Sequence, residues 1–304
     1  MKPVIMDVDT GIDDALAIAY AARSPELELI ALTTCFGNIS VQEATRNSLY
    51  VLEKLGKPVP VYEGAKLPIS GSLKKAYARH IHGQDGLGNT LREEPQGHKA
   101  ELAAVEYIIR QVKERPHEMT IIAVGPLTNL ALAIEKAPDI IPLIGEVVVM
   151  GGAVTVPGNA TPYGEANIVA DPEAAAAVFA SGVRLTLVGL DVTMQTLLSS
   201  GSLQKWRRAG GELGGWLAEM TEFYIGAYEA RFPGIGGCGL HDPLAVGVAI
   251  DRSFVSSERM RVAVVTEGEA AGQTVGSVEG EPRIEVCTKV DADRFLQHFL
   301  SRVI

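Results

Sequence analysis

The stretch that decides the fold is Met1-Lys-Pro-Val-Ile-Met-Asp7-Val-Asp9-Thr-Gly-Ile-Asp13-Asp14, which an apolar segment from Ala15 to Ala22 follows. Val4-Ile5-Met6 is too short for a helix and is typical of a buried strand. Because successive strand residues point to opposite faces, Asp7 and Asp9 share one face at its carboxyl end. The glycine permits a sharp turn, so Asp13 and Asp14 fall in the first turn of a helix, where the dipole favours anions. In an open α/β sheet, ligands bind in the crevice beyond the strand ends.

These four carboxylates repel one another unless a positive charge lies among them. A helix N-terminus stabilises one anion by about 0.3–1 kcal/mol, which is too little to keep all four ionised. No Lys or Arg lies between Asp7 and Asp14. The pattern therefore indicates a hard divalent cation with oxygen ligands. The alternative is one capping Asp beside solvated surface carboxylates, which fits poorly with so much charge at the end of a buried strand.

The composition is that of a globular protein: 304 residues, of which 47% are hydrophobic and 21% are charged. A net charge of −10 argues against binding to nucleic acid or to an anionic membrane surface. The three cysteines are scattered without a C-x-x-C pair, which indicates neither disulfides nor a zinc site. Charged Asp7 and Asp9 lie where a signal peptide needs its apolar stretch, and no apolar run reaches the length of a membrane span. We expect a cytoplasmic protein.

Strand-like and helix-like patterns alternate along most of the chain. This predicts an α/β fold with a mainly parallel, open, Rossmann-like sheet and helices on both faces. The expected strands are 4–6, 29–35, 59–62, 119–124, 146–150 and 184–190, and the expected helices are 41–55, 99–114, about 128–136 and 172–180. The stretches 64–98 and 153–170 are expected to be loops.

The order of elements changes after Asp191. We expect a helical region near residues 200–232, broken at two Gly-Gly pairs, and a glycine-rich loop at 232–239 before a helix at 244–250. A small antiparallel strand set near the C-terminus is expected from 260–266 and 283–289, with a closing helix at 291–303. Without a linker-like tract or a repeat, the chain is expected to be a single domain, 1–304.

Polar side chains collect where the predicted strands end or the next helix begins. They are Asp7, Asp9, Asn38, Asn159, Glu165, Asn167, His241 and Asp242. In a parallel sheet all of them converge on one rim, where carboxylates, amides and an imidazole suit hydroxyl recognition and a hard metal. No G-x-x-x-x-G-K-[ST] segment is present, and no G-x-G-x-x-G opens a helix. Taken singly each residue has an ordinary explanation: Asn38 is a common turn residue, His82 a solvated loop histidine, and Met150 a core residue.

Seven short segments nevertheless occur together in a recognisable order. They are Asp7-Val-Asp-Thr-Gly-Ile-Asp-Asp-Ala15, Phe36-Gly-Asn38, Ile81-His-Gly83, Val124-Gly-Pro-Leu-Thr-Asn129, Met150-Gly-Gly152, Asn159 with Glu165-Ala-Asn167, and Leu240-His-Asp-Pro243. Over nearly the whole chain this set resembles the inosine-uridine-preferring nucleoside N-ribohydrolases. The resemblance implies Ca²⁺-dependent hydrolysis of the N-glycosidic bond of ribonucleosides, to ribose and free base, by a homodimer or homotetramer.

The resemblance also implies a role for each matched residue. Ca²⁺ would be held by Asp9, Asp14, Asp242 and the main-chain carbonyl of Val124. The ribose would be held by Asp13, Asn38, Asn159, Glu165, Asn167 and Asp242, with Met150 lining the sugar pocket and His82 near the base. Asp9 would also accept a proton from the metal-bound water, and His241 would protonate the leaving base. Such a ring of acceptors suits the oxocarbenium-like state through which a glycosidic bond breaks.

The chain departs from the family pattern at a few positions. Val124 stands where the family usually has Thr, and Thr10 where many relatives have Pro. Gly83 occupies a place near the base where a purine-stacking Trp would be needed, which argues against the purine-only subgroup. The preferred base stays open, and the residue facing it is expected to be one of Tyr224, Tyr228 and Arg231.

Two alternatives are weaker. In a haloacid-dehalogenase-like phosphatase, Asp7 would be the nucleophile and Asp9 the acid/base, with Mg²⁺. That family also needs a Lys at a strand end, which this sequence lacks, and it leaves Asp13 and Asp14 unexplained. The other alternative is a non-enzymatic ribose- or nucleoside-binding protein with a structural Ca²⁺, against which the presence of His241 argues.

Overall fold

The computed structural model describes residues 1–280 and 284–304. Its strands are β1 (Lys2–Val8), β2 (Leu27–Thr34), β3 (Val61–Glu63), β4 (Thr120–Ala123), β5 (Glu146–Met150), β6 (Leu185–Val188), β7 (Leu197–Ser199), β8 (Gly237–Gly239), β9 (Val255–Val264), β10 (Thr274–Ser277) and β11 (Ile284–Val290). In the described residues, nine of them form one sheet in the order β10-β9-β11-β6-β5-β4-β1-β2-β3. Neighbours from β3 to β11 pair in parallel, whereas β9 is antiparallel to β11 and β10.

The first strand lies inside the sheet, with β2 on one side and β4 on the other. The run β3-β2-β1-β4-β5-β6 is the strand order of Rossmann folds, in which the direction of winding reverses beside β1. Ligands of such sheets bind beyond the carboxyl ends of the strands at this reversal. The predicted fold class is therefore confirmed, and the segment after β1 lies at the reversal.

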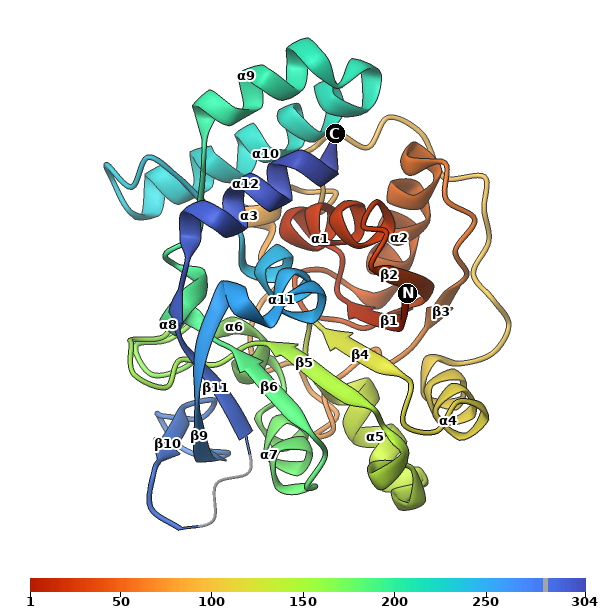
Figure 1. Ribbon diagram of the computed structural model, residues 1–304, viewed down its shortest axis with the longest axis vertical. Helices are drawn as coiled ribbons and strands as arrows, with labels where there is room; N and C mark the ends of the chain where they lie inside the picture. The colour runs from red at the N-terminus through yellow and green to blue at the C-terminus, as the bar shows by residue number, and fades with distance from the viewer. Residues whose placement is uncertain (281–283) are drawn as a thin grey trace.

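Helices cover both faces of the sheet (Figure 1). The α-helices are α1 (Ile12–Ala22), α2 (Val41–Leu55), α3 (Arg79–His82), α4 (Ala104–Glu114), α5 (Thr128–Lys136), α6 (Ala166–Ala170), α7 (Pro172–Ala180), α8 (Leu190–Thr193), α9 (Ser200–Ala209), α10 (Gly211–Arg231), α11 (His241–Ile250) and α12 (Ala292–Val303), and short 3₁₀ helices span Pro138–Leu143 and Arg252–Phe254. Helices α1, α2, α11 and α12 lie on one face, and α4, α5 and α7 on the other. None of the described helices has both the length and the hydropathy needed to cross a membrane.

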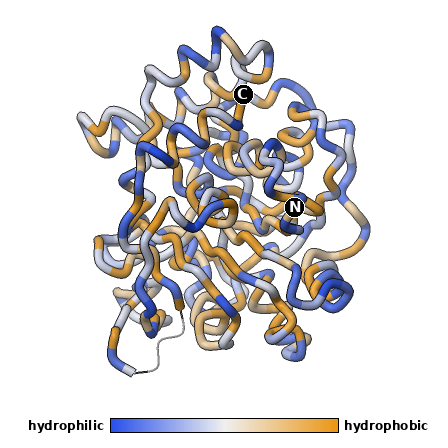
Figure 2. The backbone as a smooth tube through the Cα atoms, viewed as in Figure 1, coloured by the Kyte–Doolittle hydropathy of each residue, from blue (hydrophilic) through white to orange (hydrophobic). Residues whose placement is uncertain are grey.

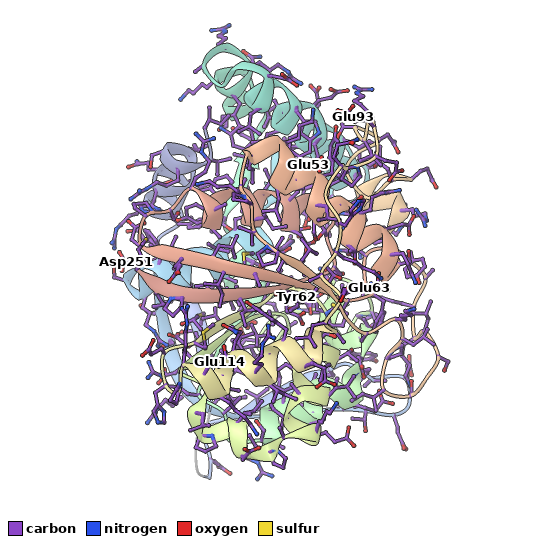
Figure 3. All side chains as sticks on the ribbon, turned by 90° about the vertical axis from the view of Figure 1, so that its right-hand side faces the viewer. Glu53, Tyr62, Glu63, Glu93, Glu114 and Asp251 are labelled. Atoms are coloured by element: carbon purple, nitrogen blue, oxygen red, sulfur yellow. The ribbon has the colours of Figure 1, made fainter. Side chains whose placement is uncertain are left out.

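Alternate residues of the central strands belong to two separate hydrophobic cores, one on each face of the sheet. Val4, Met6 and Val8 of β1 belong to the core beneath α1, whereas Ile5 belongs to the core on the α4 and α5 face. Figure 2 shows the hydrophobic colouring gathered along these central strands. Figure 3 shows the β3 edge, with Tyr62 between α2 above and α4 below. Both faces of the sheet are thus buried, as a parallel sheet requires.

The helical region after residue 200 differs from the prediction. Helix α9 ends before Gly210 and α10 begins at Gly211, as predicted, but Gly214 and Gly215 lie inside α10 rather than interrupting it. A Cβ on Gly214 would lie 2.4 Å from the backbone oxygen of Trp206 in α9. This glycine therefore permits the two helices to approach closely, and the prediction of a second break was wrong.

The boundaries of several other helices and strands also differ from the predicted ones. The expected loop 153–170 ends in α6, because the Glu165 side chain accepts hydrogen bonds from the backbone N–H groups of Asn167 and Ile168 and so starts a helix. Leu190 belongs to α8 rather than to the preceding strand, and helix α4 begins at Ala104. The predicted antiparallel pair is confirmed as β9 and β11, although β9 begins at Val255, and β7, β8 and β10 were not predicted. Arg283, the expected start of the last strand, lies outside the described residues.

Candidate active site

A cavity of about 270 Å³ lies beyond the carboxyl ends of the central strands. Segments far apart in the sequence contribute to its wall. Among the residues singled out from the sequence, those lining it are Asp13, Asn38, His82, Val124, Met150, Asn159, Glu165, Asn167, Tyr224, Tyr228, Arg231, His241 and Asp242. Asp9 and Asp14 do not line the cavity, and both are at most 1% exposed. The structure therefore places them beneath the cavity wall.

The backbone of the β1–α1 turn holds the buried carboxylates in place. Asp14 accepts hydrogen bonds from the N–H groups of Asp9 at 3.1 Å and Gly11 at 2.9 Å. Asp9 accepts one from the N–H of Asn38 at 2.6 Å, through Oδ2. These hydrogen bonds connect the turn after β1 to the turn after β2 and fix the orientations of the Asp9 and Asp14 carboxylates.

The carboxylate cluster is suited to a hard cation. Carboxylate oxygens of Asp13, Asp14 and Asp242 all lie within 4.8 Å of one another. Oδ1 of Asp9 and Oδ1 of Asp13 are buried without a hydrogen-bond partner among residues 1–280 and 284–304. Buried anionic oxygens without partners are costly unless a positive charge compensates them. The donors are all oxygens, which is the ligand set of Ca²⁺ or Mg²⁺, so the residues present fit a bound divalent cation.

The electrostatics of the cluster agree with this. Burial raises the pKa of Asp9 to about 7, and burial together with the neighbouring Asp14 raises that of Asp13 to about 7. Burial and the surrounding carboxylates also raise the pKa values of Asp14 and Asp242 well above the usual range. Without a cation these groups resist ionisation at neutral pH, and a cation would favour their charged forms.

Asp7 lies apart from this cluster and does not line the cavity. Its Oδ1 accepts hydrogen bonds from Thr33 Oγ1 at 2.6 Å and Asn129 Nδ2 at 2.7 Å. Asn129 also donates to the backbone oxygen of Thr34 and accepts from the N–H of Ala65. Asp7 therefore connects β1 and β2 to α5, and the prediction that it would converge with the other polar side chains on the rim was wrong.

The loop after β5 presents a second set of polar side chains. Glu165 accepts hydrogen bonds from the N–H groups of Gly152, Asn167 and Ile168 at 2.9–3.2 Å. Asn167 Nδ2 donates to the backbone oxygen of Val124 at 2.7 Å, which leaves that carbonyl a second lone pair for another donor or a metal. These contacts orient the side chains toward the cavity without help from a ligand.

An imidazole and two phenols form the opposite wall. His241 Nε2 forms a hydrogen bond with the Tyr228 hydroxyl, and its Nδ1 lies 2.7 Å from Thr193 Oγ1. Tyr224 donates to Asp13 Oδ2 at 3.1 Å and packs edge-on against Tyr228. A continuous chain of polar contacts thus connects His241 to Thr193 on one side and to Tyr228 on the other.

The two buried histidines of the cavity wall, His82 and His241, are neutral at ordinary pH. Burial lowers the pKa of His241 to about 4 and that of His82 to about 3. The ring of His82 stacks on Tyr224 and its Nδ1 accepts the N–H of Ile12 at 3.1 Å, so it is part of the structured wall rather than a solvated loop side chain. His80 also lines the cavity but is exposed.

The sequence from residue 4 to 297 matches the model of the family described as inosine-uridine preferring nucleoside hydrolase. The chain belongs to this family. It is 40% identical over 275 residues to uridine nucleosidase 1 of Arabidopsis thaliana, covering 90% of this chain and 81% of that protein. It is 38% identical over 300 residues to the pyrimidine-specific ribonucleoside hydrolase RihB of Escherichia coli strain SE11, covering 97% and 94%.

A solved structure gives the same result. The purine-preferring ribonucleoside hydrolase from Gardnerella vaginalis superposes with a TM-score of 0.95 at 41% identity, covering 99% of this chain and 98% of that one. The resemblance drawn from the seven segments is confirmed, and the protein is a nucleoside hydrolase rather than a phosphatase or a non-enzymatic binding protein. The named relatives differ in their stated base, so similarity alone does not choose between purines and pyrimidines.

Two polar residues of this nucleoside hydrolase's site were not singled out from the sequence. Lys75 lines the cavity from the segment between β3 and α3, and Thr193 contacts His241 from α8. Lys75 lies in a long stretch without periodicity, and Thr193 follows a strand whose end was misplaced. Only the fold, which brings these segments against the strand ends, could have shown either one.

Proposed function

We propose that this nucleoside hydrolase uses Ca²⁺ to hydrolyse the N-glycosidic bond of ribonucleosides, to ribose and a free base. The observation that supports this best is the cluster of Asp13, Asp14 and Asp242 in the same site as His241. Beside the cluster lies Asp9 Oδ1, which has no hydrogen-bond partner in the part of the chain that the structure describes. A cation site, a hydroxyl-binding wall and a proton donor within one cavity are the parts that this reaction needs.

The cation would be held by Asp9, Asp14, Asp242 and the backbone oxygen of Val124. Ca²⁺ takes six to eight oxygen ligands, carboxylates and carbonyls among them, so a nucleoside's ribose hydroxyls can complete the set. When bound, the ion supplies positive charge that orients those hydroxyls and makes water in the site more acidic.

The sugar would lie against the oriented polar side chains of the opposite loops. Asp13, Asn38, Asn159, Glu165, Asn167 and Asp242 would hold the ribose hydroxyls, with Met150 beside the ring. As the glycosidic bond breaks, positive charge develops on the sugar. Preorganised carboxylates stabilise that charge more than they stabilise the neutral substrate, which is the condition for a faster reaction.

Asp9 would act as the general base. Its Oδ2 is held by the N–H of Asn38, whereas Oδ1 is free to take a proton from the attacking water. The water oxygen forms a bond to the anomeric carbon, the carbon–nitrogen bond breaks, and its electron pair leaves with the base. Fixed geometry of this kind is expected for a base that acts in the transition state.

His241 and Tyr228 would return a proton to the leaving base. Burial keeps the His241 imidazole neutral before the reaction. The proton would therefore come from the hydrogen-bonded pair of imidazole and phenol rather than from an imidazole that is already protonated. The contact with Thr193 fixes the ring, as an orienting partner does for a catalytic histidine. His82 and Tyr224 would lie beside the base.

The test is release of ribose from inosine, adenosine, uridine and cytidine, with and without prior removal of Ca²⁺ by a chelator. We expect release that disappears on chelation and returns with added Ca²⁺. The order of the four rates then assigns the base preference. Release that persists unchanged after chelation would contradict the role of the ion, and no release from any of the four would contradict the proposed substrates.

A further inference from the structure

Lys75 places an ammonium group beside the buried carboxylates. Its side chain lines the cavity, and its Nζ lies 3.5 Å from the backbone oxygen of Gly37. Gly37 packs directly against Asp9, since a Cβ on this glycine would lie 2.0 Å from Asp9 Oδ2. Burial raises the pKa values of Asp9 and Glu165, and the charge of Lys75 acts in the opposite direction on both. The lysine therefore faces the site from the Asp9 side.

The other strong cation of the cavity wall has a different environment. Arg231 donates to the backbone oxygen of Asn159, lies over the ring of Phe232 and is exposed. Lys75 is only partly exposed, and Gly37 is its one hydrogen-bond partner among the described residues. Among the described residues its ammonium group forms no ion pair elsewhere, and its charge acts to lower the pKa values of Asp9 and Glu165.

The backbone that carries Lys75 is fixed on both sides. Ile69 N–H donates to Asp171 Oδ2 at 2.9 Å, and Ala78 N–H donates to the backbone oxygen of Asn38 at 2.8 Å. The adjacent Lys74 forms an ion pair with Glu173 at 3.0 Å, away from the cavity. The flexible stem of Lys75 can therefore withdraw its ammonium group while the segment keeps its place.

We propose that Lys75 is an internal counterion of the carboxylate cluster, and that a divalent cation displaces its ammonium group from the cluster when it binds. This inference rests on the proposed function, because it needs a cation at Asp9, Asp14 and Asp242. One ammonium and one divalent ion near the same carboxylates repel each other strongly at short range in a buried site. Lys75 therefore offsets charge in the metal-free protein and weakens cation binding.

The test is calorimetric titration of Ca²⁺ into the full chain after chelator treatment and dialysis, without nucleoside. Lys75→Met removes the charge and keeps the length of the stem, and Lys74→Met is the matched control on the neighbouring residue. We expect Lys75→Met to lower the Kd for Ca²⁺ by roughly three- to tenfold and Lys74→Met to leave it unchanged. A lysine that only supports the structure would, when removed, loosen the site and raise the Kd.

An unchanged or higher Kd in Lys75→Met would overturn the inference while leaving Ca²⁺ binding itself intact. Absence of Ca²⁺ binding in the unmodified chain and both variants would overturn this inference and the proposed metal site together. A second readout is acetylation of lysines by acetic anhydride, followed residue by residue by mass spectrometry. Lys75 should react faster when Ca²⁺ is present and Lys74 at the same rate, and equal rates at Lys75 would also overturn the displacement.

Discussion

Asp9 has one carboxylate oxygen held by the backbone N–H of Asn38, whereas the other is buried without a hydrogen-bond partner among the described residues. The substitution Asp9→Asn keeps the size of the side chain and an acceptor for Asn38 but cannot take up a proton. We expect kcat for inosine to fall by about 10²–10⁴-fold, the usual contribution of a general base. The measurement is the initial rate of ribose release under saturating substrate and Ca²⁺.

The matched control for this substitution is Asp7→Asn. Asp7 is equally buried but bonds to Thr33 and Asn129 outside the cavity, and an amide oxygen can accept the same hydrogen bonds. It should leave kcat within a few-fold of the unmodified enzyme, in the way that residues remote from the transition state do. Similar losses of kcat in both variants would show that Asp9 acts through the fold rather than on the water.

The role of His241 can be separated from general damage by changing the leaving group. His241→Ala should lower kcat/KM for inosine by about 10²–10⁴-fold, because the base then leaves without a proton. A riboside whose leaving group needs no proton, such as 4-nitrophenyl riboside, should lose far less. Tyr228→Phe should show the same pattern in weaker form, since the phenol hydroxyl contacts Nε2. Equal losses on the two substrates would remove the acid role from His241.

At the scale of elements, Asp171 connects a helix to the segment that carries Lys75. Its Oδ1 caps α7 through the N–H of Ala174, and its Oδ2 accepts hydrogen bonds from Thr128 Oγ1 and the N–H of Ile69. Asp171→Ala should lower the free energy of unfolding by about 1–3 kcal/mol, from the lost cap and the buried donors left without an acceptor.

The measurement is urea unfolding followed by circular dichroism. Glu173→Ala, two residues further along the chain in the first turn of α7, removes the ion pair with Lys74, in which each side chain is 33% exposed. It should change the free energy of unfolding by less than about 1 kcal/mol. A destabilisation no larger in Asp171→Ala than in Glu173→Ala would contradict the anchoring role.

The elements that could be predicted are those whose local pattern agrees with the fold. Val4-Ile5-Met6 and Val147-Val-Val149 are short apolar runs buried on both faces of the sheet, so their strands could be found from the sequence. Glu165 shows what local sequence cannot predict, because its capping of α6 depends on where the preceding loop returns to the end of β5. Gly214 was mistaken for a break because only the position of α9 shows that it permits close packing.

At the scale of the whole molecule, the site depends on topology more than on any one segment. A parallel sheet places the ends of β1, β4 and β5 on one rim, so Asp13, Val124 and Met150 meet there although they are far apart in sequence. Alternation of strands and helices could predict that convergence. It could not predict Lys75, because a loop side chain reaches the cavity through tertiary contacts that have no periodic signal in sequence.

The cluster also makes the stability of the whole chain depend on pH and on Ca²⁺. In the metal-free protein, burial raises the pKa values of Asp9 and Asp13 from 3.8 to about 7. Between pH 3.8 and about 7 the folded chain therefore binds more protons than the unfolded chain. The stabilisation that these two carboxyl groups give is present below about pH 4 and is lost as the pH rises through about 7. Ca²⁺ needs the ionised carboxylates, so the stabilisation it gives should grow over the same interval.

Urea unfolding at pH 5 and pH 7.5, with chelator or with Ca²⁺, measures this directly. At about 100 times its Kd, Ca²⁺ should add roughly 2.7 kcal/mol to the free energy of unfolding at pH 7.5, and clearly less at pH 5. The buried His82 and His241 act in the opposite sense, because burial lowers their pKa values and their contribution is lost as the pH falls below 6.5. Neither is a proposed ligand, so their effect cancels in the difference between the two conditions. A Ca²⁺ increment that does not change with pH would mean that the ion binds elsewhere than at these carboxylates.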